Sequence, residues 1–250
     1  MNHGEINEIL FKAYLIKCFD KGINLESLFD EINIITSLSF GPGVALPEWE
    51  DEYEPYLQAR DWSFLKEIFP KAPSDFKADL SINNISFSVK YNNAGDAALV
   101  NHTNRDGFLR ISERLGVNIN ALDAVIEEYW VLRLGDVIKQ DIKNDSPDSP
   151  FKTKKEVLRP YLEYFLFEGT GRGASPFPAD RLLELGDPYD ASTIEIHTKK
   201  ETVDAVWDDL VFSIRSKGMP KKYSEATHSN LAKWTRFRNN RHKGSLHIRL

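Results

Sequence analysis

An acidic and a basic residue stand on either side of a short polar turn in the first half of the chain. Asp79 lies in the segment KADLSI and Lys90 in ISFSVK, with Asn83-Asn84 between the two segments. Apolar and polar residues alternate on both sides, which predicts two antiparallel strands, and asparagine tolerates the positive φ of a two-residue hairpin turn. Counted from that turn, Asp79 faces Ser88. The apolar residues then share one face, and Asp79, Ser88 and Lys90 share the other.

Such a polar patch supports metal-assisted hydrolysis of a phosphodiester. The Asp79 carboxylate and a main-chain carbonyl, that of Val89, are hard oxygen ligands that suit Mg²⁺, which also takes a substrate phosphate as a ligand. The metal polarises the phosphoryl oxygen and lowers the pKa of a bound water. Lys90 would orient or help to deprotonate that water and offset charge in the transition state. The alternative is an ordinary half-buried hairpin, in which Lys90 protects an exposed strand edge.

These residues resemble the motif of the PD-(D/E)xK nuclease superfamily and, within it, the small Type II restriction endonucleases. Asp79 takes the place of the motif's aspartate and Lys90 that of its lysine, while Ser88 stands where the second acidic residue usually is. The segment GEINE at 4–8 resembles the first helix of these nucleases, in which a glutamate commonly points into the site. Glu8 is the better candidate for that glutamate and Glu5 the second. The resemblance covers residues from about 4 to 110.

The resemblance implies a Type II site-specific deoxyribonuclease that cleaves double-stranded DNA with Mg²⁺ and leaves 5′-phosphate and 3′-hydroxyl ends. Its catalytic residues would be Asp79, Ser88, Lys90 and Glu8, and its metal ligands Asp79, the Val89 carbonyl and, through water, Glu8. The implied fold is α/β, with a mixed central β-sheet flanked by helices. Alternation and charge near the end of the chain add a β-rich basic C-terminal part. Two other functions stay open: a structure-selective repair nuclease or resolvase, and a non-catalytic DNA-binding protein.

The elements around the hairpin follow from the spacing of apolar residues and from turn residues. The pattern predicts helices over 4–19, 25–31, 49–68, 120–143 (with Asn120 as N-cap) and 158–167, helical character at 97–100, and strands near 193–198, 209–215 and 246–250. The segment DSPDSP at 145–150 is expected to be a linker or long loop. It would separate a helical N-terminus plus nuclease core (1–144) from a DNA-recognition part (151–250), the two packed as one continuous domain.

Composition is typical of a folded globular protein, with 250 residues, 41% hydrophobic and 28% charged. A chain of this length buries roughly three quarters of its unfolded surface. The single Cys18 excludes a disulfide framework and a zinc ribbon. No apolar run approaches the ~18 residues of a membrane span, and the acidic N-terminus is unlike a signal peptide. We therefore expect a cytoplasmic protein with no membrane partner.

Charge is distributed unevenly along the chain. Residues 215–250 contain ten Lys/Arg and one acidic residue, a charge of +9, whereas the remainder carries −15. A polyanionic partner explains this asymmetry, and so does a basic segment packed on the protein's own acidic body. A solvated basic edge strand is a further alternative for the end of the chain.

Several of these C-terminal residues have the side chains that bind DNA. Arginine pairs with guanine and asparagine with adenine in the major groove, while lysines and other arginines contact phosphates. A glycine-rich loop at 168–178 either reaches DNA through Arg172 or is an ordinary turn. The expected DNA-binding residues are Asn92, Asn93, Asn101, Asn104, Arg172, Ser175, Lys233, Arg236, Arg238, Asn239, Asn240, Arg241 and Lys243. Two-fold symmetric target sites favour dimers, and both a monomer and a homodimer stay open.

Overall fold

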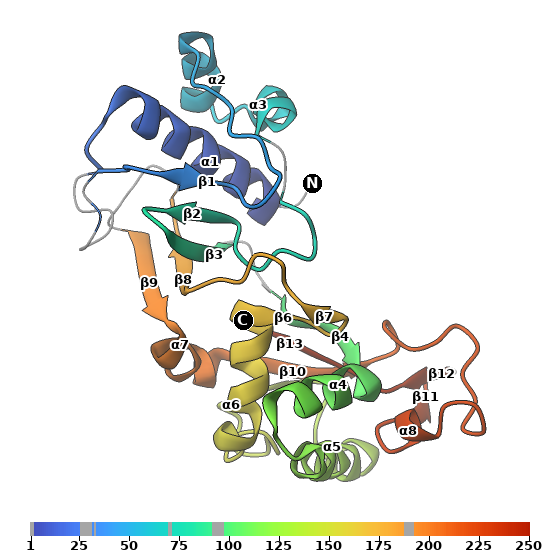
Figure 1. The fold of residues 1–250 in the computed structure, drawn as a ribbon. Helices are drawn as coiled ribbons and strands as arrows, with labels where there is room; N and C mark the ends of the chain where they lie inside the picture. Colours follow the sequence, from blue (N-terminus) through green and yellow to red (C-terminus); the bar gives the residue numbers. More distant parts are fainter. Residues whose placement is uncertain (1–2, 26–31, 33, 70–71, 92–97, 188–192) are drawn as a thin grey trace. The chain divides into compact units, whose positions relative to one another are not determined.

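The computed structural model describes residues 3–25, 32, 34–69, 72–91, 98–187 and 193–250, and it divides into two compact units (Figure 1). Unit 1 comprises residues 1–97 and 175–200, and unit 2 comprises residues 98–174 and 201–250. The boundary that we expected at 145–150 lies inside unit 2. A division there is prevented by strand pairing, because residues 181–185 pair with residues 87–91 in one sheet of unit 1.

Unit 1 is a mixed sheet with helices on one of its faces (Figure 1). Its strands lie in the order β1-β2-β3-β8-β9, in which β3 and β8 are parallel and all other neighbours are antiparallel. The elements are α1 (His3–Lys21), β1 (Leu38–Ser39), a 3-10 turn (Asp51–Tyr53), α2 (Glu54–Gln58), α3 (Trp62–Ile68), β2 (Leu80–Ile82), β3 (Ile85–Tyr91), β8 (Arg181–Leu185) and β9 (Ile194–Thr198).

Helix α1 supplies one side of the core of unit 1. Its residues Leu10, Phe11 and Leu15 are fully buried and belong to the same apolar cluster as Leu80 and Phe87 of the hairpin. Helices α2 and α3 pack on α1 (Figure 1). The apolar face of the hairpin is therefore the core face, as the alternation predicts, and the opposite face carries the polar residues.

The predicted helices of unit 1 are confirmed in part. The helix over 4–19 is α1, whereas most of the helix expected over 25–31 falls outside the described residues. The segment 49–68 divides into a 3-10 turn, α2 and α3, because Arg60 takes a positive φ of 55° and Asp61 then caps α3 by accepting from Ser63 N. Strand β8 was not predicted from the sequence.

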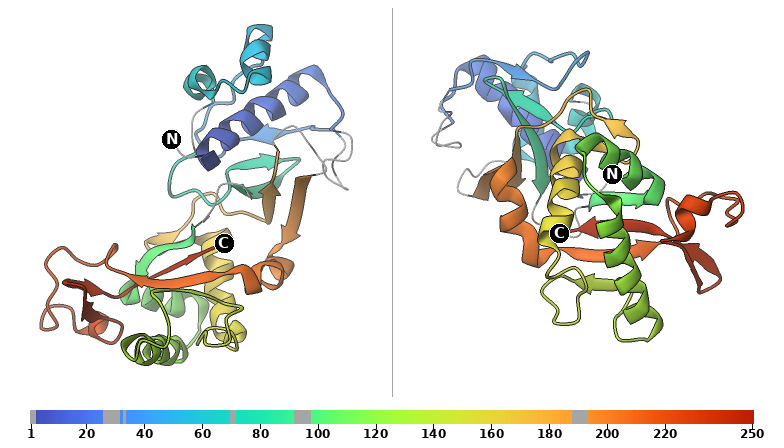
Figure 2. Two further views of the ribbon diagram at one scale, coloured as in Figure 1. Left: turned by 180° about the vertical axis from the view of Figure 1, so that it is seen from behind. Right: turned by 60° about the horizontal axis from the view of Figure 1, so that its bottom comes forward.

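Unit 2 is an antiparallel sheet of four strands in the order β4-β13-β10-β5. Figure 2 shows α4, α5 and α6 on one face of this sheet, and the hairpin β11–β12 beyond one end of it. The elements are β4 (Ala98–Asn104), α4 (Arg105–Leu115), α5 (Ile119–Leu134), β5 (Asp141–Lys143), α6 (Lys155–Glu163), a π turn (Tyr164–Glu168), β6 (Gly169–Thr170), β7 (Gly173–Ala174), a 3-10 turn (Trp207–Asp209), β10 (Val211–Arg215), α8 (Ser229–Ala232), β11 (Arg236–Arg238), β12 (Arg241–Lys243) and β13 (Ser245–Arg249). Helix α7 (Lys199–Val206) crosses from unit 1 to unit 2.

Two local predictions for unit 2 are wrong, and a third is resolved between its two alternatives. Residues 98–100 are strand rather than helix, because hydrogen bonding of β4 to β13 outweighs the helix propensity of a segment that is too short to form a helix on its own. Helix α5 is capped by Asn118 rather than Asn120, and it ends before Gly135, so that residues 141–143 are the edge strand β5. Residues 145–150, expected to be a linker or a long loop, form turns within unit 2 in which Ser149 is buried, so the loop alternative holds.

The strands expected near 193–198, 209–215 and 246–250 are confirmed as β9, β10 and β13. The helix over 158–167 corresponds to α6 and the π turn that follows it. Among the residues that the structure describes, no helix is both long and apolar enough to cross a membrane.

Candidate functional site

The turn at Asn83-Asn84 fixes the register of the β2–β3 hairpin. Both residues have positive φ, 50° and 67°, as a two-residue turn of type I′ requires. The register pairs Leu80 with Phe87, Ser81 with Ser86 and Ile82 with Ile85, which confirms the pairing counted from the sequence.

Asp79 is held directly beside the hairpin by two hydrogen bonds. Its amide N donates to Phe87 O at 2.8 Å, and its Oδ2 accepts from Val89 N at 2.7 Å. These two bonds pin the carboxylate across the strand from Ser88, on the face opposite the core. Because the backbone holds the carboxylate, little side-chain ordering would be needed for it to bind a ligand.

Lys90 lies on the same face and points back along β3. Its Nζ donates to Ser88 Oγ and to Val89 O, both at 3.1 Å. Ser88 is buried, so its hydroxyl serves as an internal support for the ammonium group. The Val89 carbonyl, which we expected as a metal ligand, accepts from Lys90 in this structure.

Electrostatics connect Asp79 with Lys90 and with helix α1. Burial raises the pKa of the Asp79 carboxyl above its ordinary value; the charge of Lys90 opposes this rise and that of Glu8 adds to it. Glu8 Oε1 is 2.6 Å from Lys12 Nζ, and the Lys12 side chain is fully buried. Glu8 therefore lies close enough to Asp79 for its charge to raise the pKa of that carboxyl, as its candidacy for the site requires.

Two of the lysines in this group were not anticipated. Lys12 comes from α1, one turn after Glu8, and its charge lowers the pKa of Asp79. Burial lowers the pKa of Lys77 to about 8, and the charge of Lys90 adds to the effect while Asp79 opposes it. Lys12 lies inside a predicted helix and Lys77 just before a predicted strand. Neither residue could be assigned to the site from the sequence, because only its charge set it apart.

A carboxylate missed by sequence reasoning lies beside Lys90. Glu184 on β8 is the parallel partner of Lys90 on β3, so the two side chains share one face of the sheet. His197 Nε2 lies 3.7 Å from Glu184 Oε1 and 3.6 Å from Glu195 Oε2. The run Leu-Leu-Glu-Leu between Asp180 and Gly186 was the available signal for a buried strand.

The side chains of the site supply only the smallest set of carboxylate ligands with which Mg²⁺ binds to proteins. Within the described ranges, no three His, Cys, Asp or Glu side chains converge as a ready metal cage. Mg²⁺ usually binds through one or two carboxylates and keeps several waters. The half-buried Asp79 carboxylate, whose pKa is raised by burial, is a group that a divalent cation would stabilise.

The expected DNA-binding residues have different surroundings. Asn92 and Asn93 lie outside the described residues. Asn104 caps α4 and donates to Gly218 O, while Ser175 Oγ accepts from Lys77 N and Phe177 N in unit 1. These contacts give both side chains structural roles. Asn101 and Arg172 are exposed, Arg172 in the short turn between β6 and β7.

Residues 236–243 form the basic hairpin β11–β12, which repeats the turn seen at residues 83–84. Asn239 and Asn240 have φ of 53° and 57°. Cross-strand pairing puts four cations on one face of the hairpin and Phe237 with His242 on the other: the cations are Arg236, Arg238, Arg241 and Lys243. Arg238 pairs with Asp136 at 2.6 Å, and Arg236 Nη1 donates to the carbonyl of Thr235.

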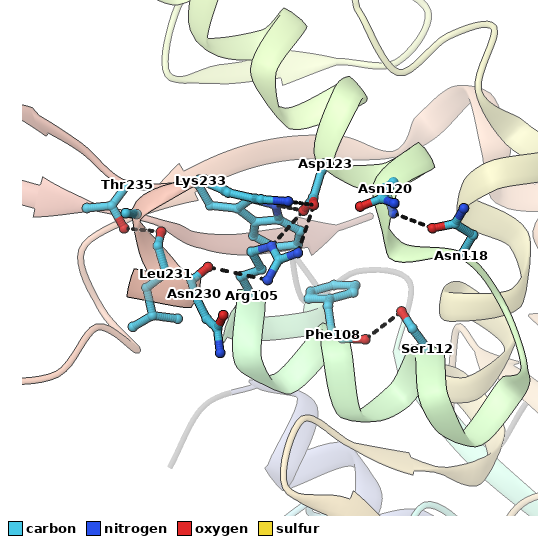
Figure 3. Close-up of polar contacts among 12 residues, drawn as sticks. Arg105, Phe108, Ser112, Asn118, Asn120, Asp123, Asn230, Leu231, Lys233 and Thr235 are labelled. Carbon is cyan, nitrogen blue, oxygen red and sulfur yellow. Dashed lines mark hydrogen bonds and ion pairs between the residues drawn. The ribbon is translucent and has the colours of Figure 1, made fainter. Parts of the chain in front are cut away.

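A buried ion pair anchors the segment that leads into this hairpin (Figure 3). Arg105 on α4 donates two hydrogen bonds of 2.8 Å to Asp123 on α5. Asp123 also accepts from Trp234 Nε1 at 2.7 Å and from Lys233 Nζ at 3.3 Å. Lys233, expected to contact DNA, thus has a carboxylate partner in the structure.

Comparison with known proteins adds no relative: no protein-family model, curated protein or solved structure matches the chain.

Proposed function

We propose that this chain is a Mg²⁺-dependent endonuclease of the Type II restriction class. The observation that supports this most is the shared position of Asp79 and Lys90 beside Ser88, in the predicted hairpin register. The mixed sheet of unit 1, with α1 on its core face, is compatible with a restriction-endonuclease-like core. That finer fold assignment is part of the proposal.

Each residue of the site has a distinct part in the proposal. Asp79 and the Val89 carbonyl would hold Mg²⁺, with Glu8 acting through water, and the ion would supply polarisation of the scissile phosphoryl group. Lys90 would give up its bond to Val89 O, orient the attacking water and offset the charge that develops on the phosphate. Water adds to phosphorus, the bond from phosphorus to O3′ breaks, and the 3′ oxygen leaves as a hydroxyl.

Glu184 provides the carboxylate that the sequence motif lacks at Ser88. It occupies the position beside Lys90 on the neighbouring strand, on the same face of the sheet as Ser88. A carboxylate supplied from β8 instead of β3 would reach the same region of the surface. This assignment is part of the proposal, and Glu184, like Glu8, would reach the metal through water, since no three acidic side chains converge within the described ranges.

Digestion of bacteriophage DNA tests the proposal as a whole. With Mg²⁺ we expect discrete fragments whose ends share a short sequence, and with EDTA we expect none. Cutting confined to branched DNA would favour a structure-selective nuclease instead. Uncut DNA under conditions where the protein binds a duplex would contradict nuclease activity.

One observation favours a second function, that of a non-catalytic DNA-binding protein. Lys12 and Lys90 already contact the oxygens that a metal would need, and the described side chains form no three-ligand cluster. Such a protein would bind the duplex without metal-dependent turnover, which the same digestion distinguishes.

A further inference from the structure

Unit 2 contains a cavity that the sequence motif did not predict. Its volume is 580 Å³, which lies within the range of about 300–1,000 Å³ typical of small-molecule sites. Four cations line it, together with the polar side chains of His102, Gln140, Ser216 and Asn239: these cations are Arg215, Lys217, Arg241 and Lys243. No acidic residue is part of the lining.

The positive charge of this cavity is neutralised only in part. Arg215 donates to both carboxylate oxygens of Asp141, at 2.8 and 2.9 Å, and Arg249 shares that carboxylate at 3.3 Å. Lys217 and Arg241 are exposed, and neither side chain forms an ion pair within the part of the chain that the structure describes. The lining therefore carries more cations than the adjacent carboxylate can balance.

Lys243 shows how strongly the cations affect one another. Its Nζ donates to Gln140 Oε1, a neutral acceptor. Burial lowers the pKa of Lys243, and the charges of Arg133, Arg238 and Arg215 lower it further, while Asp141 opposes the shift. A ligand with negative charge would relieve this repulsion.

His102 adds a polar, uncharged group to the wall. Its ring stacks on that of His247 at 4.3 Å between centroids, and its Nδ1 is buried with no hydrogen-bond partner among the described residues. Burial lowers the pKa of His102 to about 4, with contributions from His247, Lys217 and Arg215, so the ring is neutral at pH 7. The backbone of His102 has a positive φ of 48°, an uncommon conformation that occurs at binding sites.

The loop that carries Lys217 is held in place by its own contacts. Gly218 has a φ of 90°, and an added Cβ would collide with the His102 carbonyl. Asn104 Nδ2 donates to Gly218 O at 3.1 Å. Because these contacts fix the loop against β4, the cavity is built into the fold of unit 2.

We propose that this cavity is a phosphate-binding site that accepts more than one phosphate group. Four lining cations and a volume in the range of small-molecule sites support a ligand larger than a single ion. Two sources have this chemistry: successive phosphates of a DNA backbone, and the phosphates of a free nucleotide. The first source rests on the proposed function, whereas the anion site itself does not.

Binding of the full-length protein in EDTA, where no cleavage occurs, tests the proposal. The probes are a fluorescein-labelled duplex, followed by anisotropy, and ADP and pyrophosphate, followed by calorimetry. The test variant is Lys217→Ala/Arg241→Ala, and the matched control is Lys221→Ala/Lys222→Ala. Lys221 and Lys222 are exposed and lie outside the lining, close to Lys217 in sequence. All four residues are exposed, so thermal unfolding is expected to be unchanged in both variants.

If the cavity binds the DNA backbone, the test variant loses tenfold or more in duplex affinity. The slope of log affinity against log salt also falls by about 0.9 for each phosphate contact that is lost. If it binds a free nucleotide, ADP and pyrophosphate bind to the wild type and not to the test variant. Equal losses in the test and control variants, or no loss of any probe, would overturn the proposal. If the protein does not cleave DNA but the test variant still loses probe binding that the control variant keeps, only the proposed nuclease function is contradicted.

Discussion

At the scale of single residues, the proposed chemistry needs an ionised Asp79, whereas the stability of the fold favours a neutral one. Its carboxylate is held by Val89 N and lies among charges from Glu8, Lys12 and Lys90. The raised pKa means that the folded protein holds the Asp79 proton more tightly than the unfolded chain does. Ionised Asp79 therefore destabilises the fold at neutral pH, which is a common property of active-site carboxylates.

The substitution Asp79→Asn is expected to raise the melting temperature at pH 7 by about 2–4 °C, which corresponds to about 1 kcal/mol. The stabilisation has a definite pH dependence. Because the folded pKa is raised, the destabilising effect appears as pH rises from the unfolded value through the folded one. The gain from Asp79→Asn should accordingly shrink in acid, and differential scanning calorimetry at several pH values measures it.

The exposed Asp75→Asn serves as the control and is expected to leave the melting temperature unchanged. A lower melting temperature for Asp79→Asn at pH 7 would contradict this account of the carboxylate.

At the scale of elements, Asn83 of the Asn83-Asn84 turn has two structural roles. Asn83 supplies the positive φ, and its side chain also connects the hairpin to the segment before β1. Its Oδ1 accepts from Thr36 N at 2.7 Å and Ser37 N at 3.1 Å, while its Nδ2 donates to Ile34 O at 2.9 Å. The turn thus positions Asp79 and Lys90 and fastens the edge of the sheet.

Glycine and alanine at position 83 separate the two functions of Asn83. Asn83→Gly keeps the positive φ and loses the side-chain hydrogen bonds, so we expect a loss of about 1–2 kcal/mol. Asn83→Ala loses the same bonds and also puts alanine, which tolerates the left-handed conformation less well than asparagine does, at a positive φ, so we expect a loss of about 2–4 kcal/mol. Urea unfolding measures both. Asn84→Gly is the matched control, because Asn84 is exposed and has a φ of 67°. Equal losses for Asn83→Gly and Asn83→Ala would show that backbone conformation does not matter here.

The ion pair Arg105–Asp123 gives a second prediction at this scale. It anchors the segment 233–235, which leads into the basic hairpin. Burial alone would raise the pKa of Asp123, but hydrogen bonds from Arg105 and Trp234 hold it below its ordinary value. Asp123→Ala leaves Arg105 buried without its carboxylate, so we expect a loss of about 3–5 kcal/mol in the free energy of unfolding at neutral pH. The lowered pKa means that this stabilisation is complete above about pH 4 and decreases as pH falls further.

Asp136→Asn is the control for that prediction, since Asp136 forms an ion pair with Arg238 but is largely exposed, and asparagine tolerates the positive φ of 54° at this position. It is expected to change stability by about 0–1 kcal/mol. Urea unfolding of both variants at neutral and acid pH makes the comparison. A loss for Asp123→Ala that stays constant down to pH values below its ordinary pKa would contradict the role of its charge.

The same elements show what the sequence could and could not predict. The register of the β2–β3 hairpin depends on a two-residue turn and on alternation within it, so it follows from local sequence. Strand β8 pairs with β3 although about 90 residues separate the two strands in the chain. This parallel pairing depends on tertiary folding and cannot be read from local sequence. The position of Glu184 beside Lys90 was therefore inaccessible to sequence reasoning, although Asp79 and Lys90 were not.

At the scale of the whole molecule, charge distinguishes the two units. Unit 1 contains 11 Lys/Arg and 21 Asp/Glu, whereas unit 2 contains 21 Lys/Arg and 17 Asp/Glu. Both interpretations of the basic C-terminal segment find support within unit 2. Arg215, Lys233 and Arg238 pair with its own carboxylates, while Lys217 and Arg241 do not within the described ranges. The second group is the one that an outside polyanion would meet.

The central claim is that Asp79 and Lys90 hydrolyse DNA, and plasmid cleavage by Lys90→Ala tests it most directly. We expect the wild type to linearise or fragment the plasmid with Mg²⁺, and Lys90→Ala to be slower by about 100-fold or more while it still binds a duplex. Lys66→Ala, which removes a half-buried lysine of α3, should cleave like the wild type. Undiminished cleavage by Lys90→Ala would contradict the claim.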